Sequence, residues 1–300
     1  MFVIIGATGN TGSAVAQNLL ATGQKVRVVG RSEVKLQRFT SKGAEAFGGD
    51  VLDTPAMTRA FSGARGVYAI IPPNYSQDDF RGYQGRVSES LAKALQTAGV
   101  DYVVALSSIG AQLPEGAGPI SGLHHFEQRL NQVPGLNVLH LRAGYFFENF
   151  FWQIGTIQRF GMLAGTMRAD LSIPMIATRD IGARAAEALL RRDFRGHQTR
   201  ELLGPADLTQ AEAAAVIGNA IGRPDLKYSQ LPHEQVEQAM LQMGLARGAA
   251  RSLNEMYAAF NEGKIQVQES RSPANTTPST FETFVAEEFV PRFRGQAGGR

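Results

Sequence analysis

The chain has 300 residues, of which 43% are hydrophobic and 19% charged, so it can bury the sizeable core of a globular protein. It contains no cysteine, which excludes disulfides, thiol nucleophiles and cysteine-based metal sites. The formal net charge is +3, and Lys and Arg are scattered rather than clustered, so we expect no direct nucleic-acid partner.

The sequence also predicts the location of the protein. No apolar run approaches the roughly 18 residues that a membrane helix needs. No basic segment precedes the apolar residues 2–5, and a glycine turn follows them directly, so we expect no signal peptide. These features predict a protein of the cytoplasm without a membrane partner.

The first half of the chain alternates short apolar runs with helical patterns. The predicted strands span residues 2–6, 25–30, 44–48, 66–72, 101–107 and 137–142. The predicted helices span residues 10–22, 32–41, 54–62, 77–98 and 121–133. Short, continuous, β-branched strands are typical of a sheet that is buried on both faces. The alternation therefore predicts an α/β fold of the Rossmann type, with a doubly wound parallel sheet and right-handed crossovers.

After about residue 150 the pattern becomes mostly helical. The predicted helices span residues 178–192, 209–221, 232–243, 246–262 and 279–293, and Thr209 with Glu212 forms a capping-box pattern. We expect an NAD(P)-binding Rossmann domain of residues 1–153 plus about 173–203. A smaller, helix-rich C-terminal substrate domain would take about 154–172 and 204–300. The glycine-rich tail, Gly295 to Arg300, is expected to be frayed.

A glycine-rich loop follows the first predicted strand. Gly6, Gly9 and Gly12 have the spacing G-x-x-G-x-x-G directly before the helix at 10–22. Such a loop needs glycine for its tight turn, bare backbone where a pyrophosphate approaches, and a small residue where helix and strand pack closely. Free amides at the start of the helix then favour phosphate groups. The predicted cofactor contacts in this loop are Gly6, Thr8, Gly9, Asn10, Thr11 and Gly12.

The end of the second predicted strand indicates which dinucleotide binds. NAD-binding proteins usually carry Asp or Glu there to bind the ribose hydroxyls. This sequence has Arg31 followed by Ser32, and a guanidinium can form paired hydrogen bonds with a 2′-phosphate. The sequence therefore favours NADP(H), with NAD(H) as the alternative. The other interpretation of Arg31 is an ordinary surface charge.

Four motifs resemble the NmrA-like family, an atypical branch of the short-chain dehydrogenase/reductase superfamily, near its NAD(P)H:quinone oxidoreductase-like members. They are the glycine loop, Gly-Asp-Val-Leu-Asp at 49–53, Leu-Ser-Ser-Ile-Gly at 106–110 and Leu-Arg-Ala-Gly-Tyr-Phe-Phe-Glu-Asn at 141–149. The resemblance covers about residues 1–200, although Ala143 stands where the family usually has proline.

This resemblance implies several cofactor contacts. Pro72 would flank the adenosine, Ser107 would lie near the nicotinamide, and Gly144, Tyr145 and Phe146 would cover the nicotinamide ring. From the residues themselves we expect Asp50 and Val51 near the adenine, and we interpret Asp53 as a helix cap.

The Tyr-x-x-x-Lys pair of the catalytic superfamily members is absent. Counting back from the strand at 137–142 places its two positions near Ile120 and His124, or His125 if the register shifts by one. Reduction of a simple ketone gives an alkoxide that needs a positioned acid, whereas a quinone or an activated enone gives a delocalised anion that can be protonated later. The predicted catalytic residues are His124 and Tyr145, although His124 could equally be an ordinary helix residue.

Two functions stay open. The favoured one is an NADPH-dependent reductase of a small apolar, quinone-like or enone-like substrate. The aromatic run at 145–152 could wall that substrate, with Phe150 and Phe151 favoured as core. The alternative is a redox sensor that binds the dinucleotide without turning it over and acts through a protein partner. No histidine pair has metal-ligand spacing, so no metal is expected, and no pattern predicts the oligomeric state.

Overall fold

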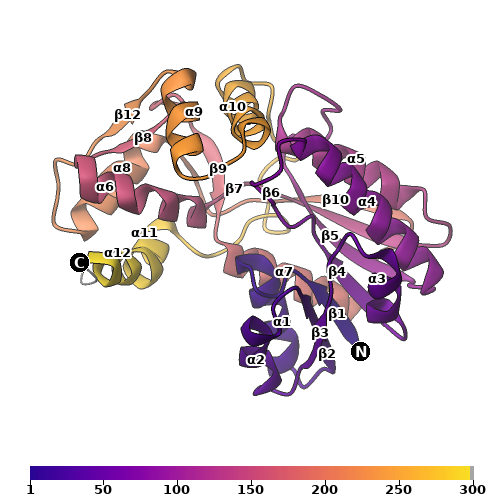
Figure 1. Cartoon of the computed structure of the whole chain (residues 1–300). Coiled ribbons are helices and arrows are strands. Elements are labelled where there is room, and N and C mark those ends of the chain that lie inside the picture. The colour runs from indigo at the N-terminus through magenta and orange to yellow at the C-terminus, as the bar shows by residue number, and fades with distance from the viewer. Residues whose placement is uncertain (298–300) are drawn as a thin grey trace.

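The computed structural model describes residues 1–297 and contains a seven-stranded parallel sheet at one end of the molecule (Figure 1). The strand order is β10-β6-β5-β4-β1-β2-β3, and every pairing is parallel. The strands are β1 (Phe2–Ile5), β2 (Val26–Gly30), β3 (Glu45–Gly48), β4 (Gly66–Ala69), β5 (Tyr102–Ser108), β6 (Asn137–Ala143) and β10 (His197–Leu202). The order reverses direction at β1, and the crevice at such a switch point is where doubly wound sheets bind ligands.

Helices cover both faces of this sheet. They are α1 (Asn10–Ala21), α2 (Glu33–Thr40), α3 (Thr54–Phe61), α4 (Phe80–Thr97), α5 (Pro119–Asn131) and α7 (Thr178–Arg191). Alternate residues of β1 enter different apolar clusters: Ile4 packs with side chains of α1, α2 and α7, and Val3 with those of α3, α4 and α5. The predicted doubly wound Rossmann fold is therefore confirmed.

The second half builds a helix-rich layer over the carboxyl ends of the strands (Figure 1). Its first elements are β7 (Tyr145–Phe146), the 3-10 helix η1 (Phe147–Gln153), α6 (Ile154–Phe160), β8 (Leu163–Gly165) and β9 (Ile173–Ile176). The later ones are β11 (Asp207–Leu208), α8 (Gln210–Ala220), β12 (Tyr228–Gln230), α9 (His233–Gln242), α10 (Arg247–Asn261), α11 (Phe281–Phe284), the π-helical turn η2 (Val285–Phe289) and α12 (Val290–Ala297).

Most predicted elements are confirmed within three residues, and the differences have local causes. The fourth strand ends at Ala69 rather than residue 72, shortly before Pro72 and Pro73. Helix α4 begins at Phe80 rather than 77 because Asp79 caps it, accepting a 2.9 Å hydrogen bond from the amide of Gly82. The predicted capping box of Thr209 and Glu212 is also present, at the start of α8.

The C-terminal predictions need two corrections. The helix expected at 279–293 is divided into α11, η2 and α12, and it continues to Ala297. The tail from Gly295 is therefore helical rather than frayed as far as Ala297, and the rest of that prediction lies outside the described residues. Within residues 1–297, no helix combines the length and the apolar character that crossing a bilayer requires.

Candidate functional site

The glycine loop has the geometry of a phosphate-binding turn. Gly6 has a φ of +69°, and a Cβ added to it would lie 2.3 Å from Cδ1 of Ile70. A Cβ on Gly12 would lie 2.4 Å from the carbonyl oxygen of Gly6. A Cβ on Gly9 would approach nothing closer than 3.4 Å, so this part of the loop is open. The loop therefore fits a dinucleotide pyrophosphate, which needs a tight turn beside bare backbone.

The other predicted loop contacts lie on the same turn. Thr8 and Asn10 are exposed, whereas the side chain of Thr11 is buried. The first amide of α1 that bonds back along the chain belongs to Ser13, which donates to the carbonyl of Gly9. The amides of the first turn before it point out of the helix end, where anions bind. Thr11 can therefore offer its backbone amide but not its hydroxyl.

Residues predicted to bind the adenosine half gather around Tyr83. Its hydroxyl donates a 2.9 Å hydrogen bond to the carbonyl of Pro72. Burial raises the pKa of Tyr83, Asp50 raises it further and Arg31 lowers it, so both charged groups lie near this ring. Arg31 is exposed, and no ion pair or hydrogen bond within residues 1–297 occupies its guanidinium. The carboxyl ends of β2, β3 and β4 therefore present a free cation beside the expected adenosine position.

The remaining adenosine residues flank this group. Ser32 precedes α2, and its hydroxyl makes no capping hydrogen bond. Val51 is half-buried in the turn after β3, where Asp50 accepts a 2.9 Å bond from the amide of Leu52. Asp53 caps α3 by accepting a 2.9 Å bond from the amide of Ala56, which confirms its interpretation as a cap.

Ser107 belongs to a buried polar network. Its hydroxyl donates to Oε1 of Glu127 at 2.5 Å, and Arg142 donates to both oxygens of the same carboxylate, at 2.9 and 2.6 Å. Ser107 and Glu127 are each 2% exposed. The Ser107 proton is therefore used inside the fold, and its predicted contact with the nicotinamide stays a prediction.

His124 lies on α5 at the level predicted for the missing lysine. Its Nδ1 is 2.9 Å from the carbonyl oxygen of Ala111, and its ring meets that of His125 edge-on at 5.6 Å. The contact with Ala111 uses one ring nitrogen and fixes the orientation of the imidazole. The catalytic role of His124 stays a prediction.

The aromatic run after β6 divides between core and open surface. Phe147 and Phe150 are buried and pack on Phe281 at ring-centroid distances of 5.2 and 5.0 Å. Phe150 is thus core, as predicted, but Phe151 is only partly buried. Tyr145 is half-buried, and Trp152 is 53% exposed.

The backbone at the start of this run packs closely against β9. A Cβ on Gly144 would lie 2.6 Å from the carbonyl oxygen of Pro174, so only glycine fits there. Phe146 is half-buried and pairs with Ile176 of β9. The contacts of Gly144, Tyr145 and Phe146 with the nicotinamide stay predictions.

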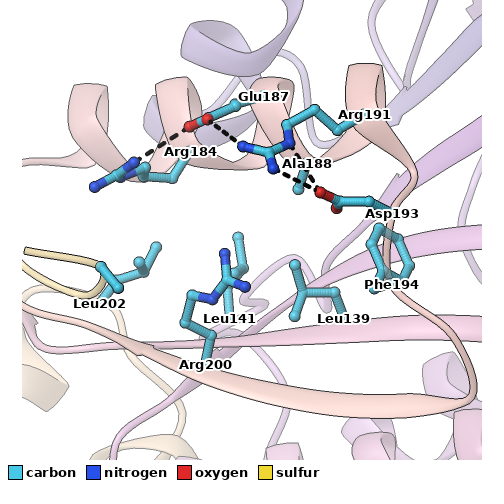
Figure 2. Close-up of a pocket in the computed structure, with 11 residues that line it drawn as sticks. Leu139, Leu141, Arg184, Glu187, Ala188, Arg191, Asp193, Phe194, Arg200 and Leu202 are labelled. Atoms are coloured by element: carbon cyan, nitrogen blue, oxygen red, sulfur yellow. Dashed lines mark hydrogen bonds and ion pairs between the residues drawn. The ribbon is translucent and has the colours of Figure 1, made fainter.

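A cavity of about 350 Å³ adjoins the glycine loop. Its lining comes from the loop, α1, α2, η1, α7 and the C-terminal helices. The residues are Thr8, Gly9, Asn10, Ser13, Ala14, Gln17, Arg38, Glu148, Phe151, Thr178, Arg179, Glu288 and Arg292. A second cavity, of about 230 Å³, lies between α7 and β10 and includes Arg184, Arg191 and Leu202 (Figure 2). None of the predicted site residues lines the second cavity.

Glu148 is the residue in the first cavity whose role the sequence analysis missed. Its carboxylate accepts bonds from the amide of Thr178, at 2.9 and 3.1 Å, and from the Thr178 hydroxyl at 2.5 Å, so it caps α7. Burial raises its pKa to about 7. Between pH 4.5, the ordinary pKa of a glutamate, and about pH 7, the folded chain therefore binds more protons than the unfolded chain. The stability of the fold should fall as pH rises through this range. The sequence did offer one signal for Glu148, since an acidic residue within the aromatic run at 145–152 must be buried or lie at its edge.

The fold and the site together define a class of protein. A doubly wound sheet, a glycine loop at its first turn and a free arginine after β2 are the features of a Rossmann-type dinucleotide-binding protein. The NmrA-like family profile matches residues 1–285, so the chain belongs to the NmrA-like family. The family resemblance predicted from the motifs is confirmed.

Several known proteins are similar to this chain. The NAD(P)H azoreductase of Xenophilus azovorans is 28% identical over 260 residues, which cover 86% of each chain. The NADPH-dependent quinone oxidoreductase QOR2 from Escherichia coli, solved with NADPH, superposes with a TM-score of 0.82 at 22% identity, over 96% of this chain and all of that one. NmrA, a negative transcriptional regulator solved with NAD, superposes with a TM-score of 0.72 at 16% identity, over 99% of this chain and 97% of that one.

Proposed function

We propose that this protein is an NADPH-dependent reductase of flat, conjugated acceptors of the quinone or enone kind. The observation that carries the proposal is the combination of an open glycine loop and an unpaired Arg31 with half-exposed aromatic side chains, at a site without the Tyr-x-x-x-Lys pair. The similarity to an NAD(P)H azoreductase supports it, since an azo dye is also a flat conjugated acceptor.

The binding half of the site follows from the charges and amides present. The amides of residues 10–12 would hold the pyrophosphate, and Arg31 would bind the 2′-phosphate that distinguishes NADP(H) from NAD(H). When bound, NADPH supplies a hydride. Tyr145 and Phe146 would exclude water from one side of the acceptor, because both rings are partly buried beside the end of β6.

The acceptor class follows from the missing acid. A quinone or an enone spreads the charge that hydride addition creates over a conjugated system, so no proton is required at the moment of transfer. Positioning then supplies most of the rate. His124 would orient the substrate or return a proton afterwards, since only one of its ring nitrogens is used by Ala111.

A specific observation favours the regulatory alternative. The cavity beside Gly9 is also lined by Glu288 and Arg292 of the C-terminal helices. Arg179 at the start of α7 is paired with Glu287 at 2.7 Å. Occupancy of the glycine loop could thereby change the C-terminal surface, as a redox sensor with a protein partner would require.

Steady-state turnover tests the proposed reductase. Purified protein is mixed with NADPH and menadione, or with NADPH and an azo dye, and absorbance of the reduced nicotinamide is followed. We expect acceptor-dependent oxidation that is faster with NADPH than with NADH. Tight NADPH binding by calorimetry without turnover of any acceptor would overturn the reductase. It would favour the sensor if NADP⁺ and NADPH also bound with different affinities.

A further inference from the structure

Four tyrosines from four separate elements gather at the junction of the two halves of the molecule. They are Tyr75 in the loop after β4, Tyr145 in β7, Tyr228 in β12 and Tyr257 in α10, and each is half-buried. Tyr145, Tyr228 and Tyr257 pack against one apolar core, while Tyr257 and Tyr75 pack against a smaller one. Tyr257 therefore lies where the two clusters meet.

The only tryptophan of the chain belongs to the same group. The ring of Trp152 meets Tyr75 edge-on, at a centroid distance of 5.9 Å. Its indole is 53% exposed, so this aromatic group has an open side. A flat conjugated molecule that enters there would contact an intrinsic fluorophore.

Helix α10 is fixed against the Rossmann half, so the position of Tyr257 is fixed as well. The amide of Ala246 donates to the carbonyl of Tyr75 at 2.8 Å, and the amide of Gly248 donates to Oδ1 of Asp78 at 2.8 Å. Gly118, just before α5, has a φ of +56°, and a Cβ there would lie 2.0 Å from the carbonyl oxygen of Ser252. Figure 1 shows α10 beside α5, on the side of the sheet's carboxyl ends.

The hydroxyls in this group differ in how they are used. Tyr228 donates to the backbone carbonyl of Met167 at 3.0 Å, so its proton is engaged. Tyr145 and Tyr257 pack against the same core, and burial raises the pKa of Tyr257 to about 12 and that of Tyr145 well above its ordinary value. Both phenols are therefore neutral at physiological pH. Unlike the Tyr228 hydroxyl, neither of these two hydroxyls makes a hydrogen bond within residues 1–297, so both protons are free for a ligand.

We propose that Tyr257 and Tyr145 donate hydrogen bonds to the oxygen of a conjugated carbonyl acceptor on which negative charge develops as the hydride arrives. This inference rests on the proposed reductase function. The acceptor gains a hydrogen and an electron pair, its remaining carbonyl oxygen becomes an oxyanion, and a proton from water completes the reduced product. Neutral phenols stabilise such an anion without giving up their own protons. The pair would thus replace the stabilisation that Tyr-x-x-x-Lys gives elsewhere in the superfamily.

The test compares Tyr257→Phe and Tyr145→Phe with Tyr228→Phe. All three variants keep the aromatic ring, and only the last removes a hydroxyl whose proton already serves a backbone carbonyl. The probes are 2-hydroxy-1,4-naphthoquinone, which is an anion at neutral pH, and neutral menadione. Binding to the protein with NADP⁺ is followed by quenching of Trp152 fluorescence.

We expect Tyr257→Phe and Tyr145→Phe to weaken binding of the anionic quinone roughly tenfold or more, as loss of a hydrogen bond to a charged group should. Menadione binding should change less than about threefold, and Tyr228→Phe should keep both affinities. In turnover with menadione, Tyr257→Phe should lower kcat by roughly 10- to 100-fold with little change in KM.

Three results separate this inference from the proposed function. Unchanged binding of the anion by Tyr257→Phe would overturn the inference, even if the wild-type protein reduces quinones. Wild-type protein that binds the anion through Tyr257 but reduces no acceptor would overturn the reductase and leave the anion contact standing. If Tyr257→Phe fails to fold, Tyr145→Phe carries the same test, and unchanged anion binding by that variant would overturn the pair.

Discussion

Alanine substitutions at Gly9 and Gly12 should separate folding from cofactor binding. At Gly12 the new Cβ would lie 2.4 Å from the carbonyl oxygen of Gly6 and 2.6 Å from its carbonyl carbon, so the loop backbone must move by about 1 Å to reach ordinary contact. Overpacking of this kind typically costs 1–3 kcal/mol, so we expect Gly12→Ala to lose about 2 kcal/mol of unfolding free energy. It should also bind NADPH at least roughly tenfold more weakly, because the phosphate-binding turn is displaced.

Gly9→Ala is the matched variant in the same loop. Gly9 has a φ of −89°, which alanine adopts readily, and its new Cβ would meet nothing closer than 3.4 Å. Its unfolding free energy should stay within about 0.5 kcal/mol of wild type, as for surface substitutions. The methyl group would nevertheless lie where the pyrophosphate approaches, so NADPH affinity should fall roughly tenfold or more.

Urea denaturation followed by circular dichroism gives the two unfolding free energies, and calorimetric titration with NADPH gives the two affinities. A Gly12→Ala protein as stable as wild type would refute the packing argument. A Gly9→Ala protein that binds NADPH with wild-type affinity would show that the phosphates do not lie on this loop.

Substitutions at three charged residues should change cofactor affinity or stability. Arg31→Ala should weaken NADPH binding roughly tenfold by calorimetry and leave the NADH affinity unchanged, whereas Lys35→Ala, at an exposed cation in the next helix, should change neither affinity. Equal losses of affinity for both dinucleotides in Arg31→Ala would argue against a 2′-phosphate contact. In the wild type, Glu148 should make the unfolding free energy fall by up to about 3 kcal/mol between pH 4.5 and 7, and Glu148→Gln should abolish this fall. Urea denaturation at both pH values measures it, and the same fall in the variant would contradict the raised pKa. Arg142→Ala should lower the unfolding free energy by about 3–5 kcal/mol because it leaves the Glu127 carboxylate buried and unpaired, and a loss below about 1 kcal/mol would show that water reaches this group.

The first half of the fold could be predicted because its signals are local. The G-x-x-G-x-x-G loop lies within seven consecutive residues, and the strands on either side are short apolar runs. The polar strand β10 could not be found in this way. Its first four residues, His197 to Arg200, are exposed, and it is a strand because it pairs with β6 at the edge of the sheet. Tertiary pairing, rather than an apolar pattern, decides such an edge strand.

The candidate site shows the same division. Arg31 and Gly9 could be found from their positions after predicted strands. The approach of Tyr257 to Tyr145 could not, because more than 100 residues separate them and α10 is held in place by a loop after β4. Glu148 was missed because its burial depends on α7, whose amide at Thr178 it binds.

A single-turnover experiment tests the reductase most directly. Protein with a stoichiometric amount of NADPH is mixed anaerobically with menadione in a stopped-flow instrument, and the reduced nicotinamide and the menadione hydroquinone are quantified. We expect one hydroquinone to form for each NADPH consumed, and 4-deuterated NADPH to slow this step. Persistence of bound NADPH in the presence of menadione would contradict the reductase function, since the cofactor would then be held without being used.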